Sequence, residues 1–298
     1  MMRPMLRQEI KIREENGFRH KSEEEKIMAN PYYTVHQIDA HTWHIEDYFH
    51  DYMYVVEGGS QAAVIDTGMG LPGLKAAVQS VTDRPLIVLN THGHLDHTGA
   101  NGEFDEVYIN LTDEALMHKH SSEAYRKVSI PAFMEETGTK LPDDVTDRLI
   151  HLPDFPKVHP LTDGQIIDLG GRFLKVIAVP GHTKGSLVFL DEAGGMLFSG
   201  DMMCTMGIML NFEESTDVST FIASIEKLKQ ETQDKVENIY PGHHEIPIST
   251  EYYDKYIACG HKLLKDSTGS VVEHGTFGDF YRFHDADISL TFVESTRK

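Results

Sequence analysis

Four side chains that could bind a metal ion lie within six consecutive residues. They are His92, His94, Asp96 and His97, and the short apolar run 85–89 comes directly before them. Imidazole and carboxylate groups are the ligands that zinc takes in proteins. A single His-x-His pair would suit a histidine-rich surface loop as well as a metal site. The full pattern after a buried strand favours the metal site.

Four further ligand-capable side chains follow apolar runs elsewhere in the chain. Each run has the composition of a buried strand, and a glycine close to the polar residue gives the backbone room for a tight turn. The four residues are Asp66, His182, Asp201 and His243. We therefore expect strands to deliver these side chains.

The ordered set resembles the five motifs of the metallo-β-lactamase superfamily, over roughly residues 33–248. The matches are Asp66 in VIDTG, His92 to His97, His182 in PGHTKGS, Asp201 in FSGD, and His243 in YPGHH. The resemblance implies an α+β fold, a four-layer αββα sandwich with two mixed sheets face to face and helices outside. The metal site would lie along one edge of the sandwich, where strand ends converge.

The resemblance also implies a role for each ligand. Seven residues would bind two metal ions: His92, His94 and His182 the first, Asp96, His97 and His243 the second, and Asp201 both. Asp66 would orient a ligand imidazole through its other nitrogen. Asp96 and Asp201 would be the catalytic carboxylates. The expected cofactor is two Zn²⁺, although iron or manganese suits the same ligands.

A dinuclear zinc hydrolase is the function that this resemblance favours. A hydroxide bridging the two metals would attack an ester, thioester, lactone or lactam of a small molecule. One alternative is a mononuclear iron persulfide dioxygenase, which would use His92, His94 and His182. Another is a small-molecule phosphodiesterase.

Departures from the family pattern leave parts of this interpretation open. His244 stands where the family commonly has glycine, so either His243 or His244 could be the fifth-motif ligand. The segment after Asp201 lacks the glycine-cysteine-glycine-arginine pattern of glutathione-thioester hydrolases and the tyrosine of acyl-homoserine-lactone hydrolases. Cys204 could rival Asp201 as a ligand, but Asp201 already fills the motif position. We therefore expect the cysteine in the core or in a pocket.

Charge and cysteine content narrow the class of partners. The 298-residue chain has a net charge of −20, and such an acidic surface repels nucleic acids and anionic membranes. Cys204 and Cys259 are too few for a disulfide framework. The sequence has neither a signal-peptide core nor a run of about 18 apolar residues. We expect a cytoplasmic protein that acts on a small molecule, without nucleic-acid or membrane partners.

Composition divides the chain into a charged N-terminal extension, residues 1–29, and a metallo-β-lactamase-fold domain, residues 30–298. The extension could be a disordered arm, a solvated helix or a segment that packs on a partner subunit and so forms a homodimer. Within the domain, residues 124–160 contain several prolines and mixed polarity, which predict an irregular segment. Apolar residues such as Phe133 and Met134 favour either a lid over the substrate pocket or a surface insertion.

Periodicity predicts the remaining elements. Strands are expected between residues 34 and 66 and between 165 and 198, and helices over 72–81, 216–235 and 249–265. A further helix opens at residues 111–114, and a closing strand covers 288–293. His118 and His120 fall on that helix two positions apart, so they do not face each other. We expect both at the surface.

Overall fold

Strands from the first 160 residues form a mixed sheet in the computed structural model, which describes residues 27–152, 155–275 and 278–298. The strands follow one another in chain order, antiparallel from β1 to β5 and parallel from β5 to β8. They are β1 (Ile27–Asn30), β2 (Tyr33–Asp39), β3 (Thr42–Asp47), β4 (Tyr52–Glu57), β5 (Ala62–Ile65), β6 (Leu86–Leu89), β7 (Glu106–Ile109) and β8 (Lys157–Pro160).

A second sheet comes from the second half of the chain, in the order β14-β12-β11-β10-β9. Its strands are β9 (Ile166–Asp168), β10 (Phe173–Ala178), β11 (Leu187–Asp191), β12 (Met196–Gly200) and β14 (Asn238–Pro241). A smaller third sheet was not predicted beyond its closing strand. Its members, in the order β13-β17-β16-β15, are β13 (Ile208–Leu210), β15 (Val271–Gly275), β16 (Gly278–Asp285) and β17 (Ile288–Phe292).

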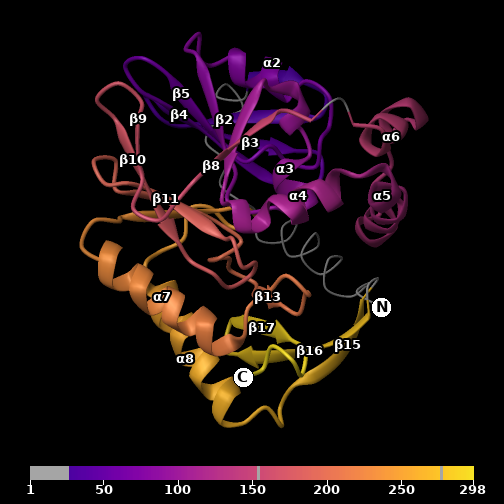
Figure 1. The fold of residues 1–298 in the computed structure, drawn as a ribbon, viewed down its shortest axis with the longest axis vertical. Coiled ribbons are helices and arrows are strands. Elements are labelled where there is room, and N and C mark those ends of the chain that lie inside the picture. The colour runs from indigo at the N-terminus through magenta and orange to yellow at the C-terminus, as the bar shows by residue number, and fades with distance from the viewer. Residues whose placement is uncertain (1–26, 153–154, 276–277) are drawn as a thin grey trace.

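Helices cover the outer side of each large sheet (Figure 1). On the first sheet these are α2 (Leu74–Gln79), α3 (Leu95–Thr98), α4 (Glu114–Ser121), α5 (Glu123–Thr137) and α6 (Asp143–Ile150), with 3₁₀ turns η2 (Asn101–Glu103) and η3 (Leu111–Asp113). On the second sheet α7 (Val218–Thr232) and α8 (Glu251–Lys265) lie side by side. Within the described residues, no helix is long and apolar enough to span a membrane.

The alternating directions of apolar side chains along the strands explain why the sheets pack face to face. On β4, Met53 and Val55 pack toward the helices of the first sheet, whereas Tyr54 and Val56 pack against the second sheet. On β11, Phe189 faces the first sheet and Val188 faces α7 and α8. Successive strand side chains point to opposite faces, so strands that are apolar throughout need cover on both sides. The predicted four-layer αββα sandwich is confirmed.

The prediction of an irregular segment over residues 124–160 is wrong, because α5, α6 and β8 lie there. Pro131 is inside α5, and Pro142 is the residue that precedes α6. Ile130 is fully buried, and the Phe133 ring packs 5.4 Å from that of Phe49 on the first half of the chain. Tertiary packing of this kind outweighs the cost of a proline within a helix.

The start of the domain also differs from the prediction at its boundary. Residues 27–30 form β1, which pairs antiparallel with β2, so the sheet begins inside the stretch assigned to the extension. The rest of that extension, residues 1–26, lies outside the described residues, as does the homodimer contact predicted for it.

One buried histidine outside the metal motifs has consequences for stability. His44 on β3 is 5% exposed and lies edge-on to the Tyr52 ring at 4.5 Å. Its Nε2 has no hydrogen-bond partner among the described residues. Burial lowers the pKa of His44 to about 3, from 6.5. The folded protein therefore holds this imidazole in its neutral form.

We expect His44 to make the fold less stable as the pH falls below 6.5. Between pH 6.5 and about 3 the unfolded chain binds a proton here that the folded chain does not bind. This one group should cost about 2 kcal/mol at pH 5 relative to pH 7. Urea unfolding at both pH values should give a smaller difference for His44→Phe than for the wild type. The same substitution at the exposed His41 should leave the difference in unfolding free energy between the two pH values unchanged. If this difference is equal in the wild type and both variants, His44 is not its source.

Candidate metal centre

The ends of neighbouring strands bring the predicted ligands together. β5 and β6 are parallel neighbours in the first sheet, and β12 and β14 are parallel neighbours in the second. Parallel strands end at the same edge of a sheet, so Asp66 and the 90–97 loop leave one sheet together, and Asp201 and His243 leave the other. Backbone hydrogen bonds from Leu187 to Thr91 and from Tyr52 to Gly242 tie the two edges to each other.

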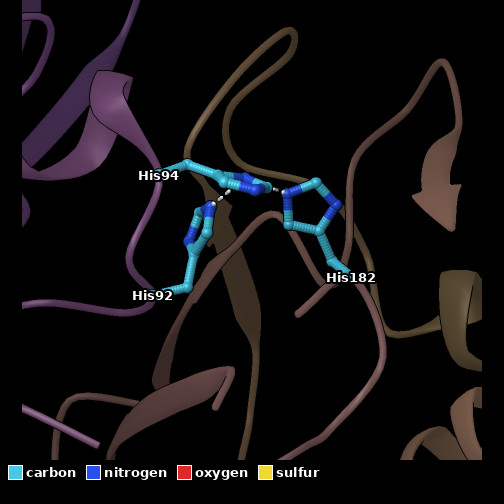
Figure 2. A group of neighbouring side chains, drawn as sticks. All are labelled: His92, His94 and His182. Carbon is cyan, nitrogen blue, oxygen red and sulfur yellow. Dashed lines mark hydrogen bonds between the residues drawn. The ribbon is translucent and has the colours of Figure 1, made fainter. Parts of the chain in front are cut away.

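Three histidines form the first group of candidate ligands. The ring nitrogens of His92, His94 and His182 point toward one another (Figure 2). His94 Nδ1 lies 3.1 Å from His92 Nε2 and 2.9 Å from His182 Nε2. All three rings are buried or nearly so, with His94 the most exposed at 7%.

Asp96, His97 and His243 form the second group. His243 Nε2 lies 3.2 Å from His97 Nε2 and 3.5 Å from Asp96 Oδ2. Asp201 lies between the groups, with Oδ2 3.4 Å from His182 Nε2 and Oδ1 3.2 Å from His97 Nε2. The structure therefore brings all seven predicted ligands together. His244 is not in either group of described residues, and its ring centre is 6.2 Å from that of His243.

The donor set fits divalent cations. Within each group the candidate ligand atoms all lie within 4.8 Å of one another. Asp201 Oδ1 is buried and accepts no hydrogen bond from the described residues, although His97 Nε2 and His243 Nε2 approach it to 3.2 and 3.3 Å. A buried carboxylate oxygen that two ring nitrogens approach without forming a hydrogen bond is placed as a ligand of an ion shared with those nitrogens.

The electrostatics of the two groups differ. Burial and the neighbouring His97, His94 and His182 lower the pKa of His92 well below its usual value. His92 is therefore neutral, which is the form that binds metal. Burial also disfavours charge on His97, but Asp201, Asp66 and Asp96 outweigh it and raise its pKa well above the usual value. The carboxylates near the second group thus stabilise a positive charge at this position. A bound divalent cation would supply such a charge.

Asp66 lies behind the candidate ligands. Its Oδ2 accepts a hydrogen bond from His97 Nδ1 at 2.8 Å, and its two oxygens accept from the Thr91 amide and hydroxyl at 2.7 Å each. Thr91 Oγ1 lies 3.0 Å from His92 Nδ1, and the carbonyl of Met209 accepts from His182 Nδ1 at 2.8 Å. These contacts fix which nitrogen of each imidazole faces the metal groups.

Three carboxylates near the ligands were not predicted for this site. Asp51 is 2% exposed, and its Oδ1 lies 3.4 Å from His243 Nδ1. Glu214 Oε1 lies 3.0 Å from His94 Nε2. Asp113 accepts hydrogen bonds from the amides of Gly93 and Gly185, and so joins the second-motif loop to the third. None of the three stands in a motif with the spacing of metal ligands. For Asp51 the sequence offered one signal, a charged residue directly before the apolar strand 52–56.

The prediction that His120 is at the surface is wrong, although His118 is exposed. His120 is 5% exposed, and its ring stacks on His94 at 5.2 Å. Its Nδ1 accepts a hydrogen bond from the Leu95 amide. Helix positions two apart point to different sides, so packing of α4 on α3 buries one histidine and leaves the other in solvent. On another side of His94, the Phe212 ring lies edge-on at 5.1 Å.

Cys204 lies in the core beneath the second sheet, in agreement with the expectation from the sequence. The side chain is 3% exposed and belongs to the apolar cluster that includes Met202 and Met203. Burial raises the pKa of its thiol well above the usual value. Cys204 belongs to none of the groups of candidate ligands among the described residues, so its position is that of a core residue.

The comparisons agree with this geometry. A model of the metallo-beta-lactamase superfamily matches residues 49–243. Acyl-coenzyme A thioesterase MBLAC2 of Gallus gallus is 31% identical over 202 residues, covering 64% of this chain and 71% of that protein. A hydroxyacylglutathione hydrolase of Gloeobacter violaceus is 27% identical, covering 67% and 65%. TTHA1623, solved in a di-iron-bound form, has 26% identity and a TM-score of 0.50, covering 70% and 94%. The chain belongs to the metallo-β-lactamase superfamily.

Proposed function

We propose that this chain is a metal-dependent hydrolase that binds two zinc ions and cleaves the acyl thioesters of small molecules. The proposal depends mainly on the position of Asp201, because one of its carboxylate oxygens lies near the first group and the other lies near the second. Oδ2 lies 3.4 Å from His182 Nε2, and Oδ1 lies 3.3 Å from His243 Nε2. A carboxylate in this position can bridge two cations, which supports a dinuclear centre over a mononuclear one.

The side chains of the site would have different roles in hydrolysis. Two divalent cations held by these groups would lower the pKa of a shared water and polarise an acyl carbonyl. Asp96 is the most exposed of the seven candidate ligands, with 26% of its side chain accessible. Its carboxylate can therefore reach a water at the mouth of the site and orient it by accepting a hydrogen bond. No serine or cysteine nucleophile is needed.

The relatives favour thioesters among the acyl compounds that the sequence allowed. One is named an acyl-coenzyme A thioesterase and another a hydroxyacylglutathione hydrolase. Both names describe cleavage of a thioester. The chain lacks the glycine-cysteine-glycine-arginine pattern after Asp201 that glutathione-thioester hydrolases carry, so we favour an acyl thioester other than glutathione's.

Iron is the main alternative to zinc, since TTHA1623 was solved with two iron ions. A persulfide dioxygenase with one iron would need the first group only. The complete second group, Asp96, His97 and His243, supports the hydrolase instead. The net charge of −20 supports an enzyme that acts on small molecules rather than on nucleic acids or membranes. A cytoplasmic location, as expected from the sequence, is part of the proposal.

A substrate panel on protein with known metal content tests the proposal. The panel contains acyl-coenzyme A, acyl-N-acetylcysteamine and hydroxyacylglutathione thioesters, the matching oxygen esters, a lactone and a phosphodiester. We expect chelator-sensitive hydrolysis of at least one thioester, faster than its oxygen ester. Cleavage of the phosphodiester alone, or oxygen uptake with a persulfide and no hydrolysis, would overturn it.

We also propose that α5 and α6 form a lid that influences substrate choice. Tyr125 on α5 stacks on His120 at 4.1 Å, and His120 stacks in turn on the candidate ligand His94. The lid therefore reaches the wall of the metal centre. Because the ligands are fixed by strand ends, substrate preference is expected to depend on such surrounding segments.

Tyr125→Ala is expected to change the ranking of acyl groups in this panel by about tenfold while two metals per chain are retained. The matched control is Val128→Ala on the same helix, where the side chain is 59% exposed. The control should leave the ranking unchanged. An equal loss of rate on every thioester for Tyr125→Ala would show that the helix is packing rather than a lid.

A further inference from the structure

We infer that Glu214 is a positioning residue that holds His94 in the orientation required by the first metal group. Glu214 lies in the segment between β13 and α7, with its side chain 18% exposed. Its Oε1 accepts from His94 Nε2 at 3.0 Å. The inference depends on the metal centre but not on the proposed substrate.

The geometry of His94 gives this contact its direction. Nδ1 faces His92 and His182 at 3.1 and 2.9 Å, so Nδ1 is the nitrogen available to a metal ion. A neutral imidazole carries one proton, and a lone pair kept at Nδ1 requires that proton on Nε2. Nε2 then donates to Glu214, and a carboxylate acceptor increases the basicity of the coordinating nitrogen.

The segment that carries Glu214 is itself held in place. The carbonyl of Glu214 accepts from the Lys184 amide at 2.9 Å. The hydroxyl of Ser215 donates to the carbonyl of His182 at 2.8 Å. The Met209 carbonyl, on β13 just before this segment, accepts from His182 Nδ1. Residues 208–215 therefore support two of the three ligands of the first group.

Carboxylate support is unequal between the two metal groups. Behind the second group, Asp66 contacts His97 and Asp51 lies 3.4 Å from His243. Behind the first group, Glu214 is the carboxylate that contacts a ligand imidazole directly among the described residues, since Asp66 reaches His92 only through Thr91. Removal of Glu214 should therefore weaken the first site selectively.

Zinc affinity measured in a His243→Ala background isolates this effect, because only the first group is then complete. Competition with a chromophoric chelator gives one zinc dissociation constant for each protein. We expect Glu214→Ala to raise this constant about 10- to 100-fold and Glu214→Gln, which retains an oxygen acceptor, to raise it less. Cobalt-substituted protein should show a shifted visible spectrum in Glu214→Ala.

Glu213→Gln is the matched control, since it removes the same charge one residue away from an exposed position. Its zinc constant and cobalt spectrum should equal those of the parent. The thermal unfolding midpoint of each metal-free variant reports on folding, and Glu214→Gln replaces the alanine variant if the latter unfolds. The inference is overturned if the Glu214 variants bind zinc as the parent does, or if Glu213→Gln weakens binding equally.

Discussion

Replacing His243 by alanine is expected to leave one metal ion per chain and to lower the rate of thioester hydrolysis about a thousandfold. His243 Nε2 lies 3.2 Å from His97 Nε2 and 3.3 Å from Asp201 Oδ1, so its loss opens the second group. The first group keeps His92, His94 and His182. Metal analysis after gel filtration, together with initial rates, measures both effects.

The neighbouring His244 supplies the control for this prediction. His244 has a positive φ of 72°, which asparagine tolerates better than most residues, so His244→Asn preserves the backbone. The carbonyl of His244 accepts from Tyr52 and is unaffected by the change. His244→Asn should retain two metals and most of the activity. If it loses a metal and His243→Ala does not, the fifth-motif ligand has been assigned to the wrong histidine.

Arg126→Ala is expected to destabilise the fold by about 3–5 kcal/mol. Arg126 on α5 is fully buried and has no carboxylate partner among the described residues. It donates to the carbonyls of Leu149 and Met69, which link α6 and the turn beside the metal centre to α5. Burial lowers its pKa to about 9, so the guanidinium stays charged at neutral pH. Alanine would leave a cavity and two carbonyls without their donors.

Urea unfolding of metal-free protein measures this effect through the midpoint and slope of the transition. The matched control is Arg148→Ala, which removes an exposed arginine from α6. We expect a change within about 0.5 kcal/mol for that variant. Equal and small losses for both arginines would mean that the buried contacts of Arg126 contribute little net stability.

The candidate metal ligands could be predicted from the sequence because each follows directly from a local feature. A buried strand ends, a glycine permits the turn, and a histidine or aspartate follows, as with Asp201 after β12. The same reasoning anticipated the two large sheets and the helices α7 and α8. Asp66 could be assigned to a supporting role because it belongs to one of these ordered motifs.

The supporting residues could not be predicted, because their roles depend on contacts between distant segments. Glu214 meets His94 across 120 positions, and Asp51 lies near His243 across 192. The burial of His120 depends in the same way on how α4 packs against α3. Proline content misled the prediction for residues 124–160, since the packing of Ile130 and Phe133 outweighs it there.

The most direct test of a dinuclear thioesterase is a zinc titration of the metal-free protein during hydrolysis of an acyl thioester. Metal-free protein should be inactive, and the rate should reach its maximum at two zinc ions per chain. Glu213→Gln should follow the wild-type curve. Full activity at one zinc ion per chain would rule out a dinuclear centre, and activity that persists after exhaustive chelation would rule out a metal-dependent reaction.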